Sequence, residues 1–255
     1  MQDEGARRVQ LEVCIESVEG ARSAAKAGAE RVELCSALTV GGLTPGAGMI
    51  EATLDAFTRP VMVLIRPRPG DFLYSPDETA VIEREIKSCA RMGVAGVVVG
   101  ALTAAGSVDV QAMRRFKDAC GDLELTFHRA FDVARDAQAS LDDLLSLGIE
   151  RLLTSGQCAR AEQGAELIAT LVRRAGSDLS VMAGSGVSSQ NVEAIVRATG
   201  VLEVHASAGR TRASSMQFRR GAVSMGVAGQ VDEYERRETS FEELERMRDL
   251  LDGIC

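Results

Sequence analysis

The chain has 255 residues, of which 45% are hydrophobic and 26% charged, a composition typical of a folded protein with a sizeable core. Its formal net charge of −8 argues against a nucleic-acid-binding function, because neutralising phosphates requires a basic surface. No apolar run reaches the ~20 residues of a membrane span, and the first residues lack a signal peptide's apolar core. We therefore expect a cytoplasmic protein that binds neither nucleic acid nor membranes. Six cysteines without a CxxC pair do not predict a disulfide framework in a chain of this length.

The first elements form one strand-helix-strand unit. Residues 9–15, VQLEVCI, alternate between apolar and polar side chains, which predicts a strand. Ser17 can cap a helix over 18–27, and Gly28 can end it. A second strand over 31–35, RVELC, completes the unit.

The same alternation of strand and helix continues along the chain. Further strands are predicted at 61–66, 96–100, 123–128, 151–155, 179–183 and 202–205. Helices are predicted at 76–92, 109–119, 137–147, 160–175 and 188–198. The segment 208–239 is expected to be irregular, before a last helix at 240–251 that Ser240 and Glu243 can cap.

Eight strands alternating with helices predict a (β/α)8 TIM-type barrel. Four junctions before the even-numbered strands begin with a glycine, which supports a repeated quarter-barrel unit: Gly28, Gly93, Gly148 and Gly200. An open doubly wound sheet is the alternative, but no GxGxxG follows the first strand. We expect a single domain over 1–255, with the barrel at about 9–207 and an irregular C-terminal extension at about 208–255.

The polar side chains of the strands are expected to face the barrel axis. On the second strand Glu33 and Cys35 share one face, and on the first strand Cys14 shares a face with Glu12. Active sites in this fold lie at the C-terminal ends of the strands. Six polar side chains lie at such ends: Cys14, Cys35, Arg66, His128, Ser155 and His205. The alternative is a closed ion-pair network, such as Arg66 with Glu33, that only fills the barrel.

Three loops after the strands add charged or glycine-rich segments. Arg66 and Arg68 lie on a proline-stiffened turn, and Arg129 and Asp132 follow the fifth strand. Arginine guanidinium groups suit carboxylate or phosphate oxygens. The sequence AGSGVS at 183–188 predicts either a phosphate-binding loop or a tight turn between strand and helix.

Cys14 and Cys35 occupy equivalent positions on adjacent strands. Neighbouring strands lie about 4.8 Å apart, so the two sulfurs can approach each other. Two thiolates suit Cu(I), a soft ion that needs few ligands. The alternative is two ordinary buried cysteines.

The chain resembles the CutC family of copper homeostasis proteins. The segments that carry the resemblance are LEVCIES (11–17), RVELCSAL (31–38), GGLTPG (41–46), IRPRPGDFLYS (65–75), TFHRAFD (126–132), LLTSGQ (152–157), MAGSGV (182–187) and LEVHASAG (202–209). The resemblance implies a TIM-type barrel and a cytoplasmic protein that often forms homo-oligomers. It also implies that Cys14 and Cys35 match the cysteines proposed to bind Cu(I).

Two main functions follow from these observations, with a binding or scaffold barrel as a third. The first is copper homeostasis through Cu(I) bound by Cys14 and Cys35. The second is a lyase, isomerase or hydrolase that acts on a small phosphorylated or carboxylated substrate. For this enzyme the candidate catalytic residues are Glu33, Arg66, His128 and Asp132. The candidate substrate-binding or anion-binding residues are Arg68, Arg129, Ser155, Gly184, Gly186 and His205.

Overall fold

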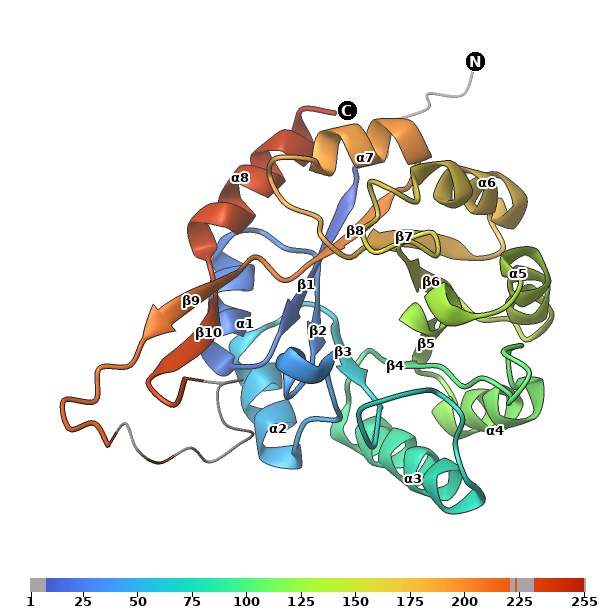
Figure 1. Ribbon diagram of the computed structural model, residues 1–255, viewed down its shortest axis with the longest axis horizontal. Helices are drawn as coiled ribbons and strands as arrows, with labels where there is room; N and C mark the ends of the chain where they lie inside the picture. The colour runs from blue at the N-terminus through green and yellow to red at the C-terminus, as the bar shows by residue number, and fades with distance from the viewer. Residues whose placement is uncertain (1–7, 221–222, 224–231, 255) are drawn as a thin grey trace.

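The computed structural model describes residues 8–220, 223 and 232–254. Eight parallel strands form a closed barrel in chain order, which confirms the predicted TIM-type fold (Figure 1). The strands are β1 (Gln10–Ile15), β2 (Arg31–Leu34), β3 (Val61–Leu64), β4 (Gly96–Val99), β5 (Glu124–Phe127), β6 (Arg151–Thr154), β7 (Ser180–Gly184) and β8 (Glu203–Ala206). The barrel closes because β1 pairs with both β2 and β8.

Helices surround the barrel on its outer side (Figure 1). They are α1 (Val18–Lys26), α2 (Ala47–Ala56), α3 (Pro76–Met92), α4 (Val110–Cys120), α5 (Ala137–Ser146), α6 (Ala165–Ala175), α7 (Val192–Thr199) and α8 (Phe241–Asp252). Helix α8 packs against α7 and α1, and its buried Leu244, Met247 and Leu251 join the core. The last helix therefore belongs to the ring around the barrel. Within the described part of the chain, no helix is long and apolar enough to cross a membrane.

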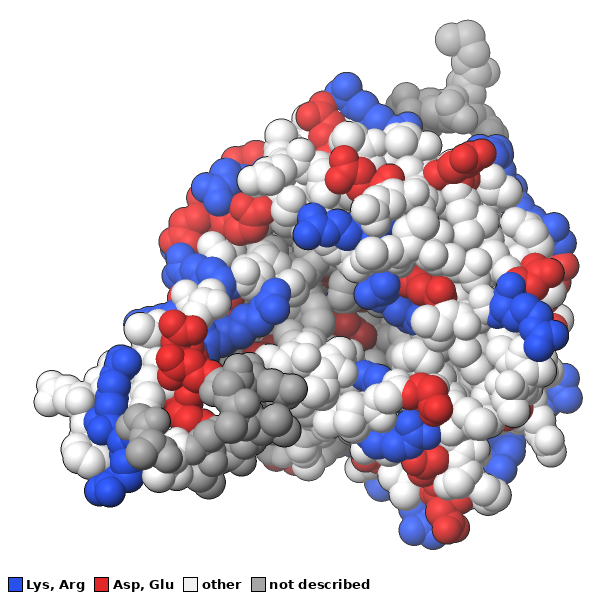
Figure 2. All heavy atoms as spheres, viewed as in Figure 1, with Lys and Arg blue, Asp and Glu red and all other residues white. Residues whose placement is uncertain are grey.

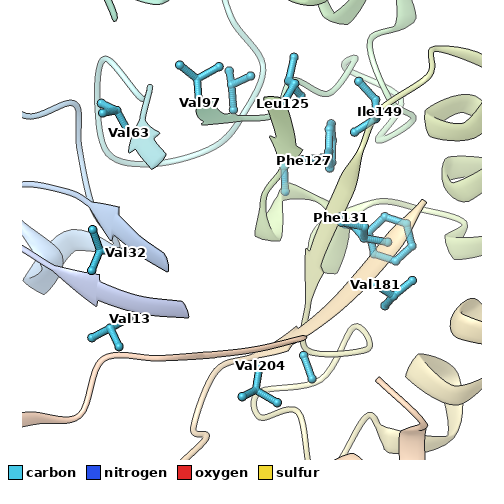
Figure 3. Close-up of a cluster of buried hydrophobic side chains, with 14 of the residues drawn as sticks. Val13, Val32, Val63, Val97, Leu125, Phe127, Phe131, Ile149, Val181 and Val204 are labelled. Atoms are coloured by element: carbon cyan, nitrogen blue, oxygen red, sulfur yellow. The ribbon is translucent and has the colours of Figure 1, made fainter. Parts of the chain in front are cut away.

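The main core lies between the strands and the helices. Val13, Val32, Val63, Val97 and Val204 point from their strands into this layer and are fully or almost fully buried (Figure 3). The other register of each strand faces the barrel axis, as the alternation predicted. Apolar burial on this scale is the main favourable contribution to folding.

An ion-pair layer fills the barrel towards the N-terminal ends of the strands. The buried guanidinium of Arg31 pairs with both Glu12 and Glu203. Arg151 pairs with Glu203 at 2.7 Å and with Glu124 at 3.1 Å. An interior network of ion pairs was one of the two expectations, and the network observed joins Arg31 and Arg151 to glutamates. Among the described residues, Arg66 and Glu33 form no ion pair with each other.

Three elements differ from the sequence-based expectation. The predicted irregular segment contains an antiparallel pair, β9 (Gly209–Ala213) and β10 (Glu235–Thr239), which projects beside α1 (Figure 1). Part of that expected segment and the last residue of the extension lie outside the described residues. Helix α2 was not predicted, because Gly46 and Gly48 at its start are typical of a turn.

Helices α6 and α7 begin later than predicted. Residues before α6 turn back over the end of β6, where Gly164 packs so closely on Ser155 that a Cβ would lie 2.0 Å from its carbonyl oxygen. Before α7, the side chain of Asn191 accepts a hydrogen bond from the Ser188 N–H at 2.9 Å and holds a turn. Both are local hydrogen-bonded turns that hydrophobic periodicity does not reveal.

Candidate functional site

Two cysteine sulfurs meet at the mouth of the barrel. Cys14 pairs in register with Glu33, and Cys35 lies two residues further along the chain, directly after the end of β2. Their Sγ atoms are 3.7 Å apart and both side chains are buried. A disulfide bond measures about 2.05 Å, so the two thiols are free but close. The proximity predicted from the strand pattern is therefore present.

Glu33 and His205 complete this cluster. Ligand atoms of Cys14, Cys35 and Glu33 all lie within 4.8 Å of one another. The His205 Nδ1 atom lies 2.8 Å from Glu12 Oε1, and its Nε2 lies 3.6 Å from Glu33 Oε2. Two sulfurs, a carboxyl group and an imidazole are thus collected on β1, β2 and β8.

The four groups titrate far from their ordinary values. The hydrogen bond from Cys35 lowers the pKa of Cys14 to about 5, against burial and with help from His205. The same hydrogen bond, together with burial, raises the pKa of Cys35. Burial and the Cys14 charge raise the pKa of Glu33. Burial opposes the charge on His205, but its bonds with Cys14 and Glu12 raise its pKa well above the usual value. The cluster therefore favours negative charge on Cys14 and positive charge on His205, while Cys35 and Glu33 hold their protons more tightly than the free groups do.

Arg66 and His128 line the same pocket as the two cysteines, which has a volume of about 130 Å³. Arg66 Nη1 donates to the carbonyl oxygens of Val40 and Gly42, each at 3.1 Å, and Nη2 donates to Gly70 at 2.8 Å. No carboxylate pairs with Arg66 among the described residues. Its guanidinium is thus held rigidly by backbone oxygens while its positive charge stays uncompensated.

The ring of His128 is buried and neutral. Nδ1 accepts a hydrogen bond from the Ala130 N–H at 3.2 Å, so the neutral ring carries its proton on Nε2. Burial and the neighbouring Arg66 charge lower the pKa of His128 to about 3. Gly100 allows this position, because a Cβ there would lie 2.6 Å from Nδ1. Phe72 contacts both groups, with its ring centroid 4.8 Å from the His128 ring and 5.1 Å from Arg66 Cζ.

Comparison with known proteins identifies the family. A family model described as the CutC family matches residues 9–210. The chain belongs to the CutC family. It is 44% identical over 242 residues to a CutC family protein of Chromobacterium violaceum, covering 95% of this chain and 98% of that relative. It is 40% identical over 244 residues to the copper homeostasis protein cutC homolog of Homo sapiens, covering 96% and 89%.

Solved structures agree with this assignment. The crystal structure of CutC from Streptococcus agalactiae superposes with a TM-score of 0.74 at 34% identity, covering 78% of this chain and 98% of that chain. Thiamine phosphate pyrophosphorylase from Pyrococcus furiosus superposes with a TM-score of 0.59 at 12% identity, covering 97% and 98%. The second likeness shows only the shared barrel fold.

Asp132 and Ser155, both expected at the site of this CutC family chain, do not line the pocket with the cysteines. Asp132 Oδ1 accepts from the Ser155 N–H at 3.0 Å, and Oδ2 accepts from Arg129 Nε at 2.7 Å and from Ser155 Oγ at 2.8 Å. Thr154 and Gln157 also donate to Oδ1. This carboxylate joins the loop after β5 to the loop after β6. Arg129 does line the pocket, but its Nε is engaged by Asp132.

Arg68 also lies away from the pocket. Its guanidinium pairs with Glu78 and Asp71 and donates to the Leu73 carbonyl oxygen at 2.8 Å. The side chain therefore holds the loop between β3 and α3. Its neighbour on that loop, Phe72, was missed as a pocket residue, because a single aromatic residue in a loop carries no signal of what it faces.

The glycine loop after β7 borders a separate cleft. A Cβ at Gly184 would lie 2.5 Å from Leu153 Cδ1, so this glycine permits close packing beside the pocket. Gly186, with a φ of +71°, lines a second cleft of about 480 Å³. In that cleft Glu243 of α8 accepts hydrogen bonds from Ser189 N and Oγ, at 2.7 and 3.0 Å. A carboxylate of the chain itself thus already contacts an N–H group next to the predicted phosphate loop.

Proposed function

We propose that this CutC family protein binds Cu(I) through Cys14 and Cys35 and serves copper homeostasis. The observation that carries the proposal is the 3.7 Å separation of the two buried sulfurs at the barrel mouth. Soft thiolate ligands select Cu(I) over the hard cations Mg²⁺ and Ca²⁺. Copper is the cargo of such a site.

The donor set fits one ion. A zinc–sulfur bond is about 2.3 Å, so two sulfurs on one ion of this size can be at most about 4.6 Å apart. The observed separation lies inside this limit without rearrangement of β1 or β2. Glu33 supplies a third donor within 4.8 Å of both sulfurs. His205 contacts both Glu12 and Glu33, so it holds Glu33 in place from the adjacent strands β8 and β1.

The free cysteines support a reducing compartment. Within the described part of the chain, Cys14, Cys35, Cys89, Cys120 and Cys158 form no disulfide. Disulfides are rare in the cytosol, where thiols are kept reduced. We therefore place the proposed function in the cytoplasm, where Cu(I) and free thiols coexist.

Binding of Cu(I) to the reduced protein under anaerobic conditions tests the proposal. A chromogenic Cu(I) chelator in competition with the protein gives the affinity and the stoichiometry. We expect one ion per chain, and we expect the Cys14→Ser/Cys35→Ser double variant to lose that ion. The matched control is Cys89→Ser/Cys120→Ser, which removes two equally buried cysteines on α3 and α4 and should bind normally. Unchanged stoichiometry in the first double variant would refute the proposal.

A further inference from the structure

The pocket that contains the two cysteines also has polar groups that a copper ion would not need. Arg66 and His128 are 7% and 5% exposed. Arg66 Nε and His128 Nε2 are both buried without a hydrogen-bond partner in the described structure. An unpaired buried donor costs roughly 1–3 kcal/mol, and more when it is charged. Two such donors on side chains that line one pocket indicate a missing ligand.

The two donors define the chemistry of that ligand. A guanidinium N–H and a neutral imidazole N–H offer two hydrogen bonds and one positive charge. They match the two oxygens and the single charge of a carboxylate. A phosphate dianion would bring further oxygens and a second charge, whereas three N–H groups of Arg66 already donate to backbone carbonyl oxygens.

The rest of the pocket defines the size and polarity of the ligand. At about 130 Å³, with a water taking about 30 Å³ of liquid, it holds about four to six non-hydrogen atoms. Four apolar side chains form part of the pocket wall: Leu38, Leu64, Phe72 and Leu153. Such a wall suits a short hydrocarbon tail.

We infer that Arg66 and His128 form a binding site for a short-chain carboxylate, with the carboxylate on Arg66 Nε and His128 Nε2 and the alkyl tail against Phe72. This assignment gives the pocket a ligand that the copper proposal does not require. It gives the anion-binding role to Arg66, which the sequence placed among the catalytic candidates, because Arg129 is engaged by Asp132 and Ser155.

Titration of the full-length reduced protein with propionate, without added copper, tests the inference. The chain has only two histidines, so the ¹H–¹³C spectrum of the imidazole groups is simple to read. We expect saturable shifts of the His128 resonances with propionate and none with the neutral isostere propionamide. Tighter binding of inorganic phosphate than of propionate, or no saturable binding of propionate, would overturn the assignment.

Variants locate the site. Removal of one charge-assisted hydrogen bond weakens binding by about ten-fold or more, so Arg66→Gln should show at least this loss. The exposed Arg174→Gln on α6 is the matched control and should bind normally. If Arg66→Gln does not fold, His128→Phe, which removes the second donor and keeps the ring, should show a similar loss. Unchanged propionate affinity in either folded variant would refute the site.

The cysteine double variant separates this inference from the copper proposal. Cys14→Ser/Cys35→Ser removes the sulfurs but keeps Arg66, His128 and Phe72. We expect it to retain saturable propionate binding, whether or not the parent protein binds copper. Loss of propionate binding in that variant would contradict a site built on Arg66 and His128.

Discussion

At the scale of single residues, the two histidines of the chain have opposite environments. His205 lies between two carboxyl groups and a thiolate, and its pKa is raised. His128 lies beside a guanidinium and an aromatic ring, and its pKa falls to about 3. Position at the end of a strand is common to both, so sequence position alone does not predict which of them is charged.

The buried neutral state of His128 predicts acid sensitivity. Its pKa is about 3 in the folded protein and 6.5 as the ordinary value, with burial and Arg66 lowering it and Asp132 opposing them. Below pH 6.5 the unfolded chain binds a proton that the folded protein does not, so stability falls with pH down to about 3. Between pH 7 and pH 5 the protonation of this histidine in the unfolded chain lowers the unfolding free energy by about 2 kcal/mol.

Urea unfolding at pH 7 and pH 5 measures this effect. The His128→Gln variant lacks the titrating ring, so it should lose about 2 kcal/mol less of its unfolding free energy over this interval than the parent protein. The comparison within each protein cancels any constant cost of the substitution. An equal loss in both proteins would contradict the assigned protonation state.

The candidate site shows which residue-level features a sequence can predict. Strand alternation was sufficient to place Cys14, Cys35 and Glu33 at the barrel axis, because side-chain direction along a strand is a local property. The engagement of Asp132 by Ser155 depends on which loops meet in space. Contacts of this kind join distant parts of the chain and leave no local pattern.

At the scale of elements, boundaries with side-chain caps were predicted best. Helix α3 begins at the predicted residue, because Ser75, Pro76 and Glu78 form a capping box with proline in the first turn. Helix α2 has a glycine before its first residue and no side-chain cap, and it was missed. The β9–β10 pair was missed as well, since its exposed strands lack the alternation of a buried face.

The capping box of α3 gives a prediction at this scale. Ser75 Oγ accepts from the Glu78 N–H at 3.2 Å, and Glu78 accepts from the Ser75 N–H at 2.7 Å. Ser75→Ala removes the first bond and should lower the unfolding free energy by about 1 kcal/mol. Ser75→Asp keeps an acceptor at the same position and should remain close to the parent protein. Denaturant unfolding of both variants measures the difference, and equal destabilisation would show that the cap contributes nothing.

At the scale of the whole molecule, the barrel interior has two layers with different roles. The layer near the N-terminal ends of the strands is a closed set of ion pairs around Arg31. The layer at the mouth contains the sulfurs and the unpartnered donors of Arg66 and His128. The hollow at the barrel axis is visible from outside, with acidic atoms at its bottom (Figure 2). Charged side chains are thus paired with one another deep in the barrel, whereas the Arg66 guanidinium at the mouth has no carboxylate partner among the described residues.

The ion-pair layer predicts a large effect on stability from one substitution. Arg31→Met leaves Glu12 and Glu203 buried with their main shared partner removed, and breaking a buried pair in this way costs about 3–5 kcal/mol. The matched control is Arg174→Met, which breaks the exposed pair with Asp142 and should cost at most about 1 kcal/mol. Denaturant unfolding at pH 7 measures both variants. In the parent protein Arg31 and His205 hold the pKa of Glu12 at about 2, although burial alone would raise it. Without the guanidinium this pKa rises, so Glu12 takes up a proton in acid and no longer needs a cationic partner. The difference in unfolding free energy between Arg31→Met and the parent should therefore become smaller in acid. Similar costs for the two variants at pH 7 would show that the buried layer adds no more to stability than a surface pair does.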